Sequence, residues 1–151
     1  MKITVLGDGG WGTALACHLH HRGRRVAWWG AFPDYLRELD RRRRNRKYLP
    51  GIPIPRSLRI VPELEEAVQD AGLVILAVPS QHVRAVVRRL APLRSAYPGA
   101  IFLSVSKGVE RRSLKRMSEV IAEELGRVPF AVLSGPSIAS EVAKGQPASL
   151  V

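Results

Sequence analysis

Cysteine, acidic residues and long apolar runs are all scarce in this chain of 151 residues. The single cysteine, Cys17, cannot form an internal disulfide, and nothing else argues for an oxidising compartment. The longest strongly apolar run, Leu73 to Val78, is far shorter than the roughly 18 residues that a membrane span needs. The apolar N-terminal run is too short for a signal peptide and leads directly into glycines. We therefore expect a cytoplasmic chain without a membrane span.

Acidic residues are outnumbered by basic ones, 13 Asp and Glu against 24 Lys and Arg, which gives a formal net charge of +11. Such an excess favours an anionic partner, either nucleic acid or small anionic molecules. Arginine predominates along the whole chain rather than in one patch, so we favour an arginine-rich composition or the guidance of small anions. His18 and His21 have helical spacing but are joined by no carboxylate or cysteine, so no metal site is expected.

With 46% hydrophobic residues, the chain can bury the core of one ordinary domain. Its most informative stretch is a short apolar strand that runs into Gly7, Gly9 and Gly12, spaced as G-x-G-x-x-G before a helix. Gly7 permits a tight turn, Gly9 lets a pyrophosphate approach the backbone, and Gly12 lets the helix pack closely on the strand. The N–H groups at the start of that helix then face the phosphates. This context predicts dinucleotide binding.

Hydrophobic periodicity predicts an alternation of strands and helices. Strands are expected at 3–6, 25–29, 59–61, 73–78, 100–105 and 130–133, and helices at 11–22, 33–44, 62–69, 80–90, 113–125 and 138–143. Ser80 and Ser137 are expected to cap helices, and Leu114 to be buried with its helix. The expected fold class is α/β, a Rossmann-like doubly wound and mainly parallel sheet with helices on both faces.

The cofactor preference of such a fold is set at the end of its second strand. An acidic residue there would bind the adenosine ribose 2′-hydroxyl and repel a 2′-phosphate. This chain has Gly30 and Ala31 instead. With neither a carboxylate nor a fixed cation expected there, the sequence predicts dual specificity, with NADP(H) favoured by roughly tenfold or less at low salt through mobile arginines.

Two further stretches carry charges or amides that could meet a ligand. Lys107 follows the expected strand at 100–105, and ligands of open parallel sheets bind beyond the carboxyl ends of strands. Ser134 to Ser137 form a second glycine turn before a short helix, where exposed amides could hold an anion. The run from Arg41 to Lys47 could instead be a nucleic-acid patch, although no aromatic residue is interleaved with its charges.

Several separated motifs together resemble those of bacterial NAD(P)-dependent glycerol-3-phosphate dehydrogenase. They are Gly7 to Ala16, Asn45 with Tyr48 to Gly51, Ala77 to Ser80, Ser106 to Glu110, and Ser134 to Ser137 with Ala139, Glu141 to Ala143 and Gly145. The resemblance covers essentially the whole chain. The last two motifs are far more specific than the glycine motif, which many dehydrogenases share.

The resemblance implies reversible reduction of dihydroxyacetone phosphate to sn-glycerol 3-phosphate for phospholipid synthesis, with NAD or NADP as cofactor. The cofactor-binding residues expected from the glycine motif and the resemblance are Gly7, Gly9, Gly10, Trp11, Gly12, Ala31, Tyr48, Lys107 and Ala139. The expected substrate-binding residues are Lys107, Gly135 and Ser137. In two places the chain departs from the family's usual residues: Gly10 replaces a serine or other polar residue, and Ala31 replaces an arginine or histidine.

The apolar end of the chain, residues 147–151, reads as a strand that has just begun, so we expect residues 1–151 to be a fragment. The resemblance implies a helical substrate and catalytic domain after 151, which holds the catalytic lysine, so no catalytic residue is assigned in this chain. If the protein forms a homodimer, we expect the contact to be made through that domain. Two alternatives remain open: another hydroxyacid or sugar-acid dehydrogenase, and a basic nucleic-acid-binding protein that uses Arg41 to Lys47.

Overall fold

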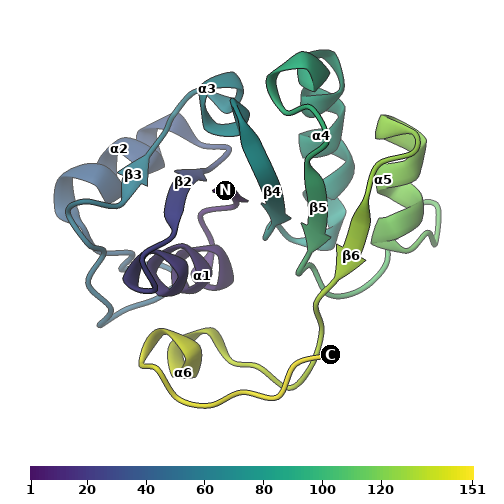
Figure 1. The fold of residues 1–151 in the computed structure, drawn as a ribbon. Helices are drawn as coiled ribbons and strands as arrows, with labels where there is room; N and C mark the ends of the chain where they lie inside the picture. The colour runs from purple at the N-terminus through teal and green to yellow at the C-terminus, as the bar shows by residue number, and fades with distance from the viewer.

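The computed structural model describes residues 1–151, which form one six-stranded parallel sheet flanked by helices (Figure 1). The elements are β1 (Lys2–Leu6), α1 (Gly10–His21), β2 (Arg25–Trp29), α2 (Pro33–Arg42), β3 (Arg59–Ile60), α3 (Leu64–Val68), β4 (Ala71–Leu76), α4 (Ser80–Leu90), a 3₁₀ helix (Ala91–Ala96), β5 (Ile101–Ser104), α5 (Met117–Leu125), β6 (Phe130–Val132) and α6 (Ala139–Ala143). The strand order is β3-β2-β1-β4-β5-β6. This is the doubly wound order of dinucleotide-binding folds, so the expected fold class is confirmed.

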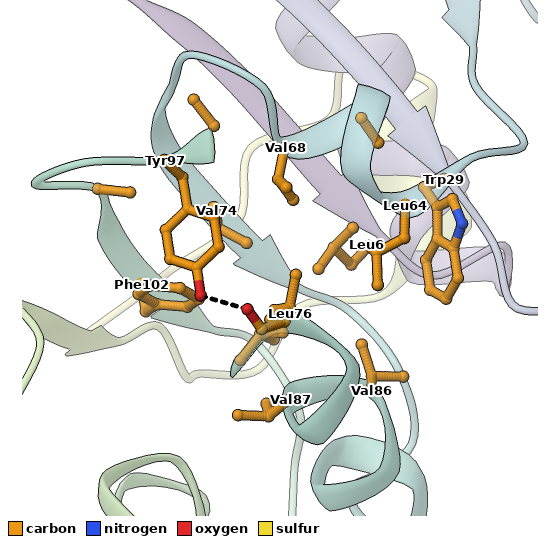
Figure 2. Close-up of a cluster of buried hydrophobic side chains, with 14 of the residues drawn as sticks. Leu6, Trp29, Leu64, Val68, Val74, Leu76, Val86, Val87, Tyr97 and Phe102 are labelled. Carbon is orange, nitrogen blue, oxygen red and sulfur yellow. Dashed lines mark hydrogen bonds between the residues drawn. The ribbon is translucent and has the colours of Figure 1, made fainter. Parts of the chain in front are cut away.

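The sheet is covered on both faces because neighbouring residues of its central strands point to opposite sides. Val5 packs in a layer that includes apolar residues of α1 and α2, whereas Leu6 packs in a layer that includes residues of α3, α4 and α5. Figure 2 shows part of the second layer, in which the Tyr97 hydroxyl donates a hydrogen bond to the carbonyl oxygen of Leu90 at 2.7 Å. Both faces of the sheet are therefore buried, so a ligand site has to be formed by the loops at its edges.

The chain reverses its winding direction between β1 and β4. β1 pairs with β2 on one side and with β4 on the other, and the helices that follow β1 and β4 lie on opposite faces. Loops after such strands diverge and leave a crevice at the carboxyl edge of the sheet. The short α6 lies beyond that edge (Figure 1) and beside α1.

Several expected element boundaries were wrong for local reasons. α2 ends at Arg42 because Arg43 adopts the left-handed conformation, with φ 51°. The caps of α4 and α6 are Pro79 and Ile138 rather than Ser80 and Ser137, and neither makes a side-chain cap bond.

The expected helix at 113–125 begins only at Met117, where the Glu119 carboxylate accepts a hydrogen bond from the Arg116 N–H at 2.8 Å. Leu114 is therefore not in the core but 76% exposed, with φ 59°.

At the end of the chain the expected strand is reduced to one paired residue. Val151 exchanges two backbone hydrogen bonds with Ser134, at 2.8 and 2.9 Å, and no further pairing is formed. None of the helices is both long and apolar enough to cross a membrane.

Candidate functional site

A cleft of about 660 Å³ opens at the crevice between β1 and β4. Seven of the residues expected to bind cofactor or substrate line it: Gly9, Gly10, Trp11, Tyr48, Lys107, Ser137 and Ala139. They come from the glycine turn, the loop after α2, the loop after β5 and the start of α6. The topology therefore brings residues more than 120 positions apart in the sequence into one cleft.

The three spaced glycines have different surroundings. A Cβ at Gly7, whose φ is +133°, would collide with the carbonyl group of Ala77, and one at Gly12 would overlap the carbonyl oxygen of Gly7. A Cβ at Gly9 would meet nothing within 4 Å. Gly7 and Gly12 thus pack the turn, whereas Gly9 leaves open space in the cleft.

The start of α1 carries no side chain that would compete with an anion for its backbone N–H groups. Its N-cap, Gly9, makes no side-chain cap bond, and the first turn carries no acidic residue. The first N–H groups of a helix have no partner within the helix, and the helix dipole adds a partial positive charge there. These donors therefore remain available to a phosphate in the space over Gly9.

Asn45 fixes the loop after α2 to the glycine turn. Although it is 1% exposed, its Nδ2 donates to the Asp8 carbonyl oxygen at 2.9 Å and to Thr13 Oγ1 at 2.7 Å. Its Oδ1 accepts from the Tyr35 hydroxyl at 2.5 Å and from the Tyr48 N–H at 3.0 Å. The sequence indicates Asn45 only as part of a motif, with no role of its own. Its position shows that it holds Tyr48 at the cleft.

Gly10 permits this loop to approach unusually closely. A Cβ there would lie 2.5 Å from the Tyr48 carbonyl oxygen and 3.9 Å from Cβ of Ala139. A serine at position 10 would therefore require the Tyr48 loop to shift. Glycine at position 10, in place of the expected polar residue, thus allows the backbone of Tyr48 to lie close to the glycine turn.

Lys107 projects from the loop after β5 and donates from Nζ to the Gly135 carbonyl oxygen at 3.1 Å. Gly135 itself does not line the cleft, but this contact places it next to the Lys107 ammonium, which is expected to bind substrate. Ser106 Oγ donates to the carbonyl oxygen of Val78 at 2.5 Å, which ties the Lys107 loop to the loop after β4.

The loop that carries Lys107 is anchored at its far end by Arg84 of α4. Arg84 is 19% exposed and makes a two-pronged ion pair with Glu110, with both N–O distances at 2.8 Å. It also pairs with Glu123 and Glu124 of α5, at 2.8 and 2.5 Å. Hydrogen bonds from Arg84 and Ser113 lower the pKa of Glu110 to about 2. We infer that Arg84 acts on the site by holding the Lys107 loop.

Replacement of Arg84 by methionine is expected to lower the melting temperature, and to do so in a pH-dependent way. The pKa of Glu110 is depressed in the folded state, so its stabilisation is present above its ordinary pKa of about 4.5 and is lost as pH falls toward 2. Melting curves of wild type and variant should therefore differ most above pH 5 and converge toward pH 2. Arg111→Met, a change at an exposed arginine of the same loop, is the control. A gap that does not change with pH would contradict this role.

The other expected residues lie outside the cleft. Ala31 is exposed at the end of β2, and its neighbour Phe32, 67% exposed, lines the cleft in its place. Of the basic run, Arg43 is occupied with the carbonyl oxygens of Pro55 and Leu58, at 3.2 and 2.8 Å. Because Arg43 leaves the helix and binds backbone, Arg41 to Lys47 do not form one helical face for nucleic acid.

Comparison with known proteins finds relatives that are named as dehydrogenases dependent on NAD(P)+. The sequence profile described as "NAD-dependent glycerol-3-phosphate dehydrogenase N-terminus" matches residues 2–151. Among curated relatives, glycerol-3-phosphate dehydrogenase [NAD(P)+] of Prosthecochloris aestuarii is 45% identical over 154 residues, covering 100% of this chain and 46% of that protein. The second enzyme of that name from Salinibacter ruber is 43% identical, over 99% of this chain and 44% of the relative.

Solved structures agree with this assignment. The crystal structure of glycerol-3-phosphate dehydrogenase from Coxiella burnetii superposes with a TM-score of 0.90 at 36% identity, over 99% of this chain and 45% of that one. The chain thus spans less than half the length of these relatives. Because the family profile matches nearly every residue, the chain belongs to the family of NAD-dependent glycerol-3-phosphate dehydrogenase N-terminal domains.

Proposed function

We propose that residues 1–151 are the cofactor-binding part of a glycerol-3-phosphate dehydrogenase. The observation that carries the proposal is the open space over Gly9, at the N-terminus of α1 and between the diverging loops of β1 and β4. A dinucleotide pyrophosphate needs such a place, because it is anionic and must approach the backbone closely. The family's relatives are named for the use of NAD(P)+.

In this proposal the cofactor crosses the cleft. Gly9, Gly10 and Trp11 lie along its pyrophosphate, and Tyr48 and Ala31 lie on its adenosine side. Ala139 closes the cleft from α6, and Gly7 and Gly12 shape the turn beneath it. The bound nicotinamide supplies the hydride, whereas the protein supplies position and electrostatics.

The substrate residues are proposed to be Lys107, Gly135 and Ser137. A fixed cation stabilises negative charge on a phosphate or on a reacting oxygen. The contact between Lys107 Nζ and the Gly135 carbonyl oxygen holds that cation beside the second glycine turn. A phosphorylated three-carbon ketone, dihydroxyacetone phosphate, and its alcohol, sn-glycerol 3-phosphate, fit this chemistry.

The remaining parts of the proposal concern the whole protein. A helical domain after residue 151 would supply the catalytic lysine and could form a homodimer contact. We propose that the whole protein acts in the cytoplasm on the path to phospholipids, with an anionic cofactor and an anionic, phosphorylated substrate. The basic surface would then raise the local concentration of these anions.

The proposal predicts that residues 1–151 bind NADH but do not reduce dihydroxyacetone phosphate. Binding should be seen as a change of NADH fluorescence on titration, with no loss of NADH absorbance after substrate is added. A longer protein that includes the proposed domain is the positive control. Turnover by residues 1–151 alone would contradict the proposed division of labour, and absence of binding to both NADH and NADPH would contradict the assigned function.

A further inference from the structure

No acidic residue directly follows β2 in the sequence, but the carboxylate of Asp8, from the glycine turn, lies beside Gly30 at the end of that strand. Because Leu6 pairs with Trp29, the residues that follow β1 and β2 lie side by side. A Cβ at Gly30 would lie 2.6 Å from Cγ and 2.7 Å from Cβ of Asp8. Only glycine at position 30 therefore leaves room for this side chain, so Asp8 and Gly30 fit one another.

The Asp8 carboxylate lacks the partners that a buried charge normally has. Its Oδ2 is buried and accepts no hydrogen bond, and burial raises the pKa of the group. The positive charge of Lys47 acts against this rise in the Asp8 pKa. However, Lys47 is exposed, and its ammonium lies 4.8 Å from the centre of the Tyr48 ring. A desolvated carboxylate with an unpartnered oxygen is unfavourable, and a ligand that donates to its other oxygen stabilises the charge.

Asp8 also lines the cleft proposed to bind the cofactor. One carboxylate oxygen lies buried against Gly30, so the other is the oxygen that a ligand in the cleft can reach. The adenosine ribose of a dinucleotide lies at the end of the second strand, which is where this carboxylate lies. The ribose offers two hydroxyl donors, whereas a 2′-phosphate would bring negative charge to a negative, partly desolvated site.

We propose that Asp8 replaces the acidic residue absent from the end of β2: its carboxylate accepts hydrogen bonds from the adenosine ribose hydroxyls and excludes a 2′-phosphate, so that the chain selects NAD(H). The inference rests on the function proposed above and names its cofactor. It differs from the sequence-based expectation of a slight preference for NADP(H), which assumed that no carboxylate reached this place. Arg43 offers no compensating cation, because it binds Pro55 and Leu58.

Fluorescence titrations with NADH and NADPH, at low and high salt, test the assignment. Wild type should bind NADH at least about 100-fold more tightly than NADPH, with a ratio that salt hardly changes. Asp8→Asn keeps the shape and removes the charge. It should weaken NADH about tenfold, strengthen NADPH and bring the ratio below about ten. Asp34→Asn, which removes an exposed carboxylate of α2, is the charge-matched control and should leave the ratio unchanged.

A second variant separates recognition from folding. Asp8→Gly combined with Gly30→Asp moves the carboxylate to the end of β2, and it should restore the preference for NADH. Circular dichroism and melting curves verify that each variant folds. Equal affinities for NADH and NADPH in wild type, or an unchanged ratio in folded Asp8→Asn, would overturn the role of Asp8 and leave the proposed function intact. Failure of wild type to bind either cofactor would overturn both.

Discussion

Replacement of Gly9 by valine is expected to abolish dinucleotide binding while leaving the fold intact. The expected loss of NADH affinity is at least about 100-fold, since the branched side chain would occupy the space that the pyrophosphate needs. The fold should tolerate the change for two reasons. A Cβ at Gly9 meets no atom within 4 Å, and the backbone there, with φ −73° and ψ −179°, suits any residue.

The measurement for this prediction pairs an NADH titration with a melting curve. Gly9→Ala is the graded control, which should weaken binding less than valine does. An NADH affinity that is unchanged in folded Gly9→Val would show that the glycine turn does not hold the phosphates. A large fall in melting temperature would show that the turn needs glycine at this position for folding.

Replacement of Gly12 by alanine should have the opposite effect, a loss of stability. Its new Cβ would overlap the Gly7 carbonyl oxygen and lie 2.9 Å from the carbonyl carbon. The same oxygen accepts a hydrogen bond from the indole of Trp28 at 2.8 Å, so the turn cannot move without breaking a buried bond. Overpacking against rigid backbone costs about 3 kcal/mol or more.

Such a cost corresponds to a fall of about 6–12 °C in melting temperature for a chain of this length. Thermal unfolding monitored by circular dichroism measures it directly. Gly9→Ala, the same substitution three residues earlier, is the matched control and should leave the melting temperature within about 2 °C of wild type. Equal melting temperatures for Gly12→Ala and Gly9→Ala would contradict the close packing of α1 on β1.

The sequence was sufficient for the fold class and for which segments meet at the cleft, because both depend on local patterns. Continuous apolar runs such as 25–29 predict buried parallel strands, and the glycine spacing predicts a turn into a helix. Residues in the motifs after those strands then come together at one edge of the sheet, which is where Gly9, Tyr48 and Lys107 are found.

Asp8 and Asn45 show why part of the site could not be predicted. Asp8 lies 22 positions before Gly30 in the printed sequence, and the two meet only because β1 and β2 pair in one particular register. Asn45 is polar and follows four arginines, so its sequence context suggests an exposed loop. Its burial follows from the path of the loop over Thr13, and only the folded chain shows that path.

Leu114 illustrates a different limit. Its spacing from Met117 and Ile121 is helical, yet the segment before α5 turns tightly instead. The Leu114 N–H donates to the Glu110 carbonyl oxygen at 2.8 Å, and the Glu110 N–H donates to that of Lys115 at 2.9 Å. The ion pair of Glu110 with Arg84, a contact between distant residues, anchors this turn and overrides the local helical pattern.

Amide chemical-shift mapping with NADH tests the central claim most directly, because it reports binding and location together. We expect the largest shifts on the glycine turn from Asp8 to Trp11, with further shifts at Tyr48, Lys107 and the start of α6. Shifts confined to the basic run after α2, or no shifts at millimolar NADH, would contradict the claim that the crevice between β1 and β4 binds the dinucleotide.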